Sequence, residues 1–247
     1  MADGSLLDSL RAIAGSEHVV THERQLATYE SDGLLQYAAK PLAVVLPGSA
    51  EEVVAVVRAC HEAETPWVAR GAGSGLSGGA LPVEEGVLIA LSRLRRILEV
   101  DVANGRVLVE PGVTNIAVSQ AVGPTHFFPP DPSSQIVCTI GGNVAENSGG
   151  AHCFKYGFTT NYVCGLEVVL ADGTVVTLGG PELDHPGYDL VGAFVGSEMC
   201  IRDRVGGEAV LEAVRSSGVL GDVAADGAHD LARRIRWVEQ VLSLIHI

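Results

Sequence analysis

Hydrophobic positions near the start of the chain recur with helical spacing. Leu6, Leu7, Leu10 and Ile13 fall on one face of a helix, which predicts helical structure within residues 5–31. The pattern then changes, because later apolar residues stand in short uninterrupted runs that are typical of buried strands.

The next segments predict a strand, a helix and a second strand. An apolar run at 42–46 lies between Pro41 and Pro47, as expected of a buried strand. Ser49-Ala50-Glu51-Glu52 has the form of a capping box and is followed by an apolar helix body. Residues 66–70 predict the second strand. Together these segments span about thirty residues, the usual size of a parallel βαβ unit.

Further along the chain the predicted elements are shorter and more mixed. An Asp-Gly turn at residues 172–173 between two apolar runs is a strong hairpin signal, because both residues tolerate positive φ. Helices and strands in this mixture predict an α+β fold. The additional predicted elements are strands at 87–91, 97–101, 107–110, 163–170 and 174–178, and a helix from Thr114 to about Val122.

Composition supports a folded, acidic protein that does not bind nucleic acid. The chain has 247 residues, of which 47% are hydrophobic and 19% charged, so it can bury a sizeable core. Its formal net charge is −14 and it has no basic stripe, which argues against nucleic acid as a partner. Thirty glycines indicate many tight turns.

Cysteines and histidines do not indicate a metal site. The five cysteines form neither a CxxC pair nor a zinc-like cluster, and the histidines form no facing pair, so we expect no metal. Unpaired thiols and an N-terminus without a secretory signal indicate a cytoplasmic location. No apolar run reaches the ~20 residues of a transmembrane helix, so no transmembrane segment is expected.

A glycine-rich loop follows the second predicted strand and is the most informative stretch. Residues 73–78 match G-x-G-x-x-G, the fingerprint of dinucleotide-binding Rossmann folds. That fingerprint requires a helix directly after the loop, whereas Gly78, Gly79 and Pro82 oppose one. A phosphate-binding P-loop is also excluded, because no Gly-Lys-Ser/Thr follows.

The loop is nevertheless suited to an anion. Closely spaced glycines allow successive backbone N–H groups to converge, and the absence of bulky side chains allows a pyrophosphate to approach them. The alternative is a flexible surface loop without a ligand. A second small-residue stretch at 138–150 favours the ligand, because it adds amides and the side chains of Asn143 and Asn147. A rigid arm at 129–134, with three prolines, precedes it.

These segments together resemble the FAD-binding domain of the glycolate oxidase FAD subunit and D-lactate dehydrogenase family, flavoproteins of the vanillyl-alcohol-oxidase or PCMH type. The order and spacing agree from about residue 20 to residue 198. The matching stretches are Tyr29-Glu30-Ser31-Asp32-Gly33-Leu34, Arg70 to Leu81, Val109-Glu110-Pro111-Gly112-Val113, Asp131-Pro132-Ser133-Ser134-Gln135, Ile140 to Gly150, Lys155-Tyr156-Gly157 and Gly196-Ser197-Glu198.

The resemblance implies a domain of two α+β subdomains with FAD between them. It implies an N-terminal helical segment at 1–36 and an FAD-binding PCMH-type domain at 37–198, divided into subdomains at about 37–95 and 96–198. Asn147 and Gly149 either bind the cofactor or only fix their loop. The implied cofactor-binding residues are Arg70, Gly71, Ala72, Gly73, Ser74, Gly75, Leu76, Ser77, Pro111, Gly112, Asp131, Pro132, Ser133, Ile140, Gly141, Gly142, Asn143, Asn147 and Gly149.

The resemblance also implies chemistry: oxidation of a small 2-hydroxy acid, such as glycolate or D-lactate, by hydride transfer to the flavin. Some members of the fold attach FAD through a His in the glycine loop, but residues 70–79 contain neither His nor Cys, which indicates non-covalent FAD. The family's base and substrate-binding residues belong to a C-terminal cap domain. The chain beyond residue 198 is too short to form that domain, so no catalytic residue is nominated.

The similarity ends abruptly after Glu198. Where the family has an apolar strand, three consecutive charges stand at 202–204, and we expect residues 199–247 to be a non-native or chimeric tail with one amphipathic helix near 231–242. The resemblance also implies other oxidase subunits as partners. The alternatives are a non-catalytic FAD-binding module, a fragment too incomplete to fold, or another member of this flavoprotein fold, such as an alkyl-glycerone-phosphate synthase or cell-wall precursor reductase.

Overall fold

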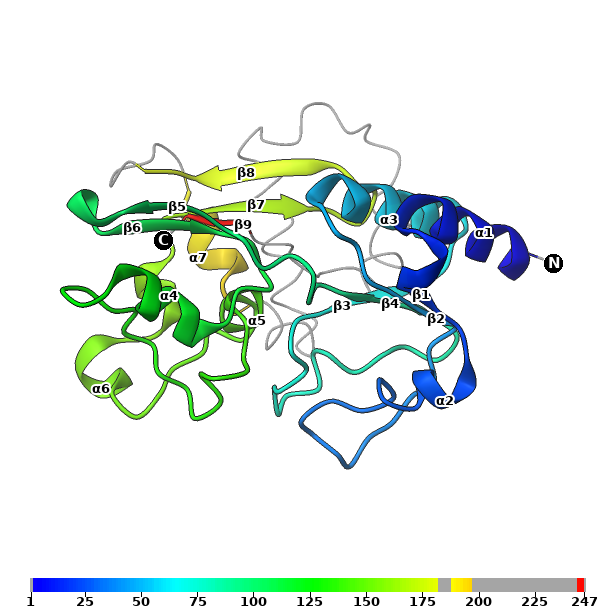
Figure 1. Cartoon of the computed structure of the whole chain (residues 1–247), viewed down its shortest axis with the longest axis horizontal. Helices are drawn as coiled ribbons and strands as arrows, with labels where there is room; N and C mark the ends of the chain where they lie inside the picture. The colour runs from blue at the N-terminus through cyan, green and yellow to red at the C-terminus, as the bar shows by residue number, and fades with distance from the viewer. Residues whose placement is uncertain (1, 182–187, 197–243, 247) are drawn as a thin grey trace.

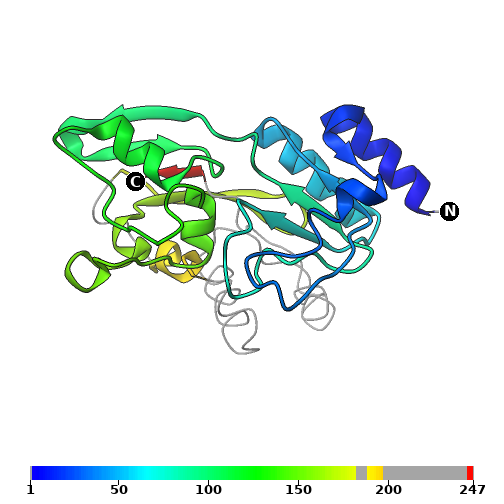
Figure 2. The same cartoon turned by 60° about the horizontal axis from the view of Figure 1, so that its bottom comes forward.

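The computed structural model of the chain describes residues 2–181, 188–196 and 244–246. These residues form two α+β subdomains, each built around one β-sheet, and the two lie side by side in both views (Figure 1 and Figure 2). The predicted α+β class is thereby confirmed.

The first subdomain contains a four-stranded sheet. Helix α3 (Ala50–Glu62) connects β2 (Ala43–Val45) to β3 (Trp67–Arg70). These two strands are parallel, as predicted. The sequence did not indicate that β4 (Val87–Ala90) would lie between them and pair in parallel with both. At the edge of the sheet, β1 (Val19–Val20) pairs antiparallel with β2. In spatial order the strands are β1 (Val19–Val20), β2 (Ala43–Val45), β4 (Val87–Ala90) and β3 (Trp67–Arg70).

Both faces of this sheet are buried, which explains the uninterrupted apolar runs. Alternate residues such as Val45 and Ile89 pack against helices α1 (Ala2–Ala14) and α3 on one face. The intervening residues, including Leu88, pack with Leu26 on the other face, where the loops around residues 27–40 and 71–86 pass (Figure 1).

The N-terminal helix is shorter than the sequence indicated. It ends at Ala14, because Gly15 takes a φ of 88° that breaks helical geometry. A short 3-10 turn η1 (Ser16–His18), β1 and the one-turn helix α2 (Glu23–Leu26) follow. The prediction of helical structure as far as residue 31 was therefore confirmed at α1 and α2 and wrong for the segments between and after them.

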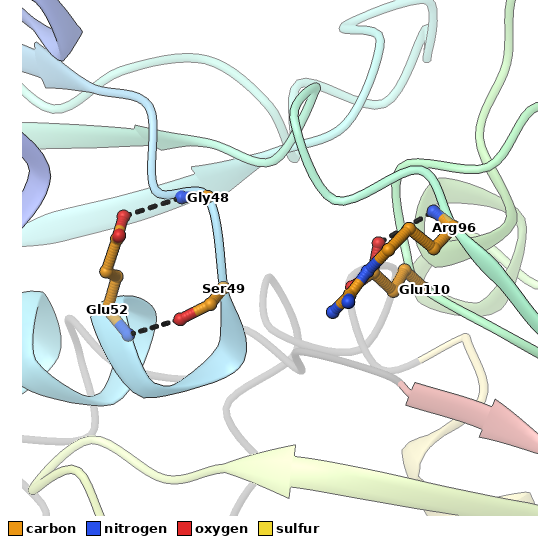
Figure 3. A network of polar contacts seen from close by, with 5 residues as sticks. All are labelled: Gly48, Ser49, Glu52, Arg96 and Glu110. Carbon is orange, nitrogen blue, oxygen red and sulfur yellow. Dashed lines mark hydrogen bonds and ion pairs between the residues drawn. The ribbon is translucent and has the colours of Figure 1, made fainter.

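The predicted cap at the start of α3 is present with one altered bond. The Glu52 backbone N–H donates to Ser49 Oγ at 3.3 Å, as in a capping box. The Glu52 carboxylate accepts from the Gly48 N–H at 2.7 Å, one residue before the position that a capping box uses (Figure 3).

The second subdomain contains an antiparallel sheet. The predicted hairpin around the Asp-Gly turn is confirmed, with Gly173 at a φ of 79°. Of the tail predicted to be non-native, residues 244–246 are described, and their backbone pairs with β6 and β7; the helix predicted near 231–242 lies outside the described residues. In spatial order the strands are β5 (Ile97–Asp101), β6 (Arg106–Val109), β9 (Leu244–His246), β7 (Gly165–Val169) and β8 (Val175–Gly179).

Helices cover one face of this second sheet (Figure 1). The shared core contains Val109, Leu166 and Leu178 from the sheet and Ile140 and Phe194 from the helices. Thr114 precedes the predicted helix as expected, although its side chain makes no capping bond. The remaining elements are α4 (Asn115–Val122), α5 (Ile140–Ala145), α6 (Cys153–Tyr156) and α7 (Leu190–Phe194), with 3-10 turns η2 (Val102–Asn104) and η3 (Thr159–Tyr162).

The segment 91–96 links β4 of the first sheet to β5 of the second and is bonded to both subdomains. Arg93 Nη1 donates to the Leu46 carbonyl at 2.7 Å on the first side. On the second side, the Arg96 backbone N–H and guanidinium donate to the buried Glu110 carboxylate at 2.7–2.9 Å. Figure 3 shows the Arg96–Glu110 pair beside the start of α3. Polar contacts from this short linker thus help to fix the relative position of the two sheets.

Candidate functional site

A cavity of about 530 Å³ opens between the two subdomains. Its first wall is the glycine-rich loop that follows β3, and its second wall comes from residues 132–149. Leu91 and Pro111 lie at the junction of the walls. Its size is within the range of small-molecule and cofactor sites in proteins.

The glycine-rich loop presents unused backbone donors to this cavity. In the described part of the chain, the backbone N–H groups of residues 72–77 donate to no protein acceptor. Gly73 takes a φ of 66°, a conformation that other residues rarely adopt. A Cβ at Gly71 would clash with Thr139 Oγ1 from the second wall. The loop therefore has both the donors and the close approach expected of a diphosphate cradle.

Arg70 supports this loop from behind. Its Nη1 donates to the carbonyl oxygens of Tyr29 at 3.2 Å and Ser31 at 2.8 Å, and its guanidinium lies 5.8 Å from the Tyr29 ring centre. A Cβ at Gly73 would meet the guanidinium directly. Burial lowers the pKa of Arg70, while the nearby Asp32 carboxylate acts in the opposite direction. Arg70 thus ties the 29–31 segment to the glycine loop.

Asp32 is a buried acid next to this arrangement. Its Oδ1 accepts the Leu34 N–H at 2.8 Å, while its buried Oδ2 has no hydrogen-bond partner among the described residues. Gly33 lies so close to the glycine loop that a Cβ there would be 2.5 Å from the Gly75 carbonyl oxygen. The Tyr29–Leu34 stretch therefore packs beneath the cradle, which no local pattern in the sequence revealed.

The second wall is built around α5. A Cβ at Gly141 would lie 2.7 Å from the Pro111 Cβ, so glycine is needed for α5 to pack on the cavity's floor. Buried Asn143 uses its amide inside the wall: its Oδ1 accepts from Asn115 Nδ2 at 2.8 Å, and its Nδ2 donates to Ser148 Oγ at 3.2 Å. Its side chain therefore shapes the wall.

Asn147 also has an internal role. It takes a φ of 48°, and its Oδ1 accepts the Thr160 N–H at 2.9 Å. Asn147 therefore lines the cavity, as the sequence predicted, but its side-chain oxygen is used to fix its own loop.

Asp131 pairs with a histidine that the sequence did not single out. Its carboxylate accepts from the His152 backbone N–H at 3.1 Å and contacts the His152 ring Nδ1 at 2.5 Å. These bonds hold the pKa of Asp131 below its usual value. The pair joins the proline arm to the loop at 149–153, two segments that contribute Pro132 and Gly149 to the cavity.

The structure brings most of the implied cofactor-binding residues together. Residues 70–77 line the cavity, as do Pro111, Pro132, Gly141, Gly142, Asn143, Asn147 and Gly149. Four implied residues do not line it: Ile140 is buried in the second core, and Gly112, Asp131 and Ser133 lie outside the lining. Sequence reasoning missed Ala69, Gly79, Ala80, Leu91, Ser134, Cys138, Thr139, Ala145, Glu146 and Ser148.

Glu146 is the most informative of the missed residues. It follows α5, and its carboxylate accepts a hydrogen bond from Ser77 Oγ across the cavity. The hydroxyl of Ser77, which the family resemblance implies as a cofactor-binding residue, is therefore hydrogen-bonded to another part of the protein. A match to the family's glycine loop does not reveal an acid that reaches it from 69 residues away.

Other kinds of site are not found in the described ranges. No group of three or more His, Cys, Asp or Glu there could hold a metal ion. Burial raises the pKa of the Cys60 thiol to about 12, which makes it unreactive. A search of the described helices finds none with the length and apolar character needed to cross a membrane.

Comparison with known proteins identifies related sequences. Residues 41–179 match the model of the FAD binding domain family. The glycolate oxidase subunit GlcD of Escherichia coli K12 is 49% identical over 195 residues, which cover 78% of this chain and 39% of that protein. The D-lactate dehydrogenase of Archaeoglobus fulgidus is 40% identical, over 65% of this chain and 36% of that protein. The chain thus spans about two-fifths of these relatives' length.

Solved structures share the fold. Alkyldihydroxyacetonephosphate synthase superposes with a TM-score of 0.68 at 24% identity, over 79% of this chain and 40% of that protein. The 4-ethylphenol oxidase of Gulosibacter chungangensis superposes with a TM-score of 0.63 at 28% identity, over 77% and 37%. p-Cresol methylhydroxylase gives 0.63 at 24% identity, over 72% and 35%. The architecture of two α+β subdomains is therefore that of the PCMH-type flavoproteins.

Proposed function

The chain belongs to the FAD binding domain family that its residues 41–179 match, and we propose that it forms the flavin-binding part of an oxidoreductase acting on a small 2-hydroxy acid. The observation that carries the flavin part is the cradle of unused amides at residues 72–77 beside the second wall. The relatives named glycolate oxidase subunit and D-lactate dehydrogenase support the substrate class, glycolate or D-lactate.

The fit of FAD to this site rests on shape and donors. The amides at 72–77 would hold the diphosphate, and close contacts at Gly71 and Gly141 keep side chains out of the space between the walls. Arg70 and Asn143 would keep the two walls in place through their carbonyl and amide bonds. When bound, FAD would supply the hydride acceptor for oxidation of the substrate's α-carbon.

We propose that the cofactor binds without a covalent bond. The described residues that line the cavity include no His, and their one thiol, Cys138, is buried with the Asn143 amide 3.4 Å from its sulfur. Acid precipitation of the purified protein tests this: the flavin should remain in the supernatant. Flavin that stays with the precipitate would contradict it.

Partners and location are also proposals. GlcD is named as a subunit, which supports cooperation of this chain with other oxidase subunits. The cytoplasmic location expected from the sequence stays a prediction, as do the domain limits and the non-native character of residues 199–247.

Anaerobic mixing of the FAD-loaded chain with 2-hydroxy acids tests the activity. If the chain is catalytic on its own, glycolate or D-lactate should bleach the flavin absorbance, while ethanol, which lacks the carboxylate, should not. FAD binding without bleaching by any 2-hydroxy acid would favour the second candidate, a non-catalytic FAD-binding fragment. That candidate rests on the cavity lining, where the described residues include no His or Lys and one acid, which Ser77 engages.

A further inference from the structure

The cavity contains one acidic and one basic side chain among its described lining residues, Glu146 and Arg70. Glu146 stands at the end of α5, and its Oε2 accepts the hydrogen bond from Ser77 Oγ. Its Oε1 would be 3.2 Å from a Cβ at Gly75. The carboxylate therefore lies directly against the glycine loop whose amides form the cradle.

No cation neutralises this carboxylate in the described part of the chain. Glu146 takes part in none of the ion pairs found there. The Arg70 guanidinium is held by the carbonyl oxygens of Tyr29 and Ser31. Burial lowers the pKa of Arg70, and the acid that acts against this is Asp32, not Glu146. The cradle thus combines neutral donors with an uncompensated negative charge at its side.

Such a charge discriminates between kinds of phosphate. In FAD the two phosphates are joined as a diester, with one ionisable oxygen each. A terminal phosphate monoester, as in FMN, carries close to two charges on one phosphorus at neutral pH, since its second pKa is about 6. A carboxylate close to one phosphorus penalises the monoester more, because both of its charges lie at that short distance, whereas the second charge of the FAD diphosphate lies one phosphorus further away.

Resting on the proposed function of the cavity as a flavin site, we propose that Glu146 is a specificity-determining residue that selects FAD over FMN. The amides of residues 72–77 attract either phosphate. Glu146, positioned by Ser77, makes the cradle unfavourable to a monoester dianion while leaving the diester accommodated. Riboflavin has no phosphate, so its affinity should not depend on the charge of Glu146.

Dissociation constants of FAD, FMN and riboflavin for wild type and Glu146→Gln test the proposal, measured by quenching of flavin fluorescence on flavin-free protein. The amide keeps the shape and the acceptor for Ser77 and removes the charge. We expect FMN to bind about five- to tenfold more tightly to the variant, the scale of one partly screened unit charge, while FAD changes less and riboflavin stays the same. Glu99→Gln, which removes an exposed charge on β5, is the matched control and should change none of the three.

An unchanged ratio of FAD to FMN affinity in Glu146→Gln would overturn the proposal, as would a selective loss of FAD affinity. If Glu146→Gln does not fold, the wild-type protein alone provides the test. In about 1 M salt, where the Debye length is about 3 Å, the ratio of its FAD affinity to its FMN affinity should fall. An unchanged ratio would refute the proposal. Wild type that binds FAD while failing these tests refutes the role of Glu146 alone. Wild type that binds no flavin refutes the proposed function as well.

Discussion

At the scale of single residues, the cavity depends on positions where a methyl group does not fit. The two walls approach so closely that Gly71 faces Thr139 and Gly141 faces Pro111. Polar side chains such as Asn143 then fix each wall internally, and the space between the walls is left to backbone donors. Binding in this site should therefore be sensitive to small additions of volume.

Gly141→Ala should lower both stability and FAD affinity. The added Cβ would lie 2.7 Å from the Pro111 Cβ, and displacing α5 should cost about 1–3 kcal/mol of unfolding free energy, as overpacking does elsewhere. Urea unfolding and FAD titration measure the two effects. Gly180→Ala, where nothing lies within 4 Å, is the control. Equal behaviour of the two variants would show that Gly141 is not constrained.

The Asp131–His152 pair should make the proline arm sensitive to acid. Since the folded pKa of Asp131 lies below the reference value of 3.8, its contribution to stability is present above that pH and is lost as the pH falls through the folded pKa. Melting temperatures at pH 7 and pH 3, on either side of the isoelectric point near 4.9, should therefore differ less for Asp131→Asn than for wild type. Identical differences would contradict the pairing.

At the scale of elements, local signals predicted α3, β2, β3 and the β7–β8 hairpin, because capping residues, apolar runs and an Asp-Gly turn act within a few residues. The end of α1 was missed since Gly15 breaks a helix whose apolar pattern continues past it. The place of β4 between β2 and β3 was not readable, because strand order depends on contacts between distant segments.

Ser49→Ala should destabilise the protein through α3. The variant loses the bond from the Glu52 N–H to Ser49 Oγ, and loss of such a cap typically costs about 1 kcal/mol. Thr114→Ala is a matched control, because Thr114 precedes α4 without a side-chain capping bond and should lose less. Thermal or urea unfolding measures both. A larger loss for Thr114→Ala would refute the assigned caps.

At the scale of the whole molecule, the cavity that we propose as the cofactor site exists only where two subdomains meet. The order of motifs in the sequence was enough to predict that residues 70–77 and most of the second wall lie together, and the structure places them around the cavity. The contacts that span the walls, such as Ser77 with Glu146, join segments far apart in the chain and follow no spacing rule. The same holds for the linker, whose Arg93 and Arg96 bond to opposite subdomains.

Arg96→Gln should weaken FAD binding without any contact to the cavity. It removes the guanidinium bonds to Glu110, which precedes the cavity residue Pro111, so the second wall loses part of its anchorage to the linker. Arg95→Gln changes the same charge at an exposed neighbouring position and is the control. We expect a several-fold rise in the FAD dissociation constant for Arg96→Gln alone. Equal constants for both variants would argue against a role of the linker.

The central claim is that the cavity between the subdomains binds FAD, and the visible absorption spectrum of the purified chain after incubation with FAD and removal of the excess tests it most directly. The account predicts the absorption bands of oxidised flavin in about a one-to-one ratio with protein, sharply reduced in Gly141→Ala under the same treatment. A well-folded chain that stays colourless after FAD is added would contradict it.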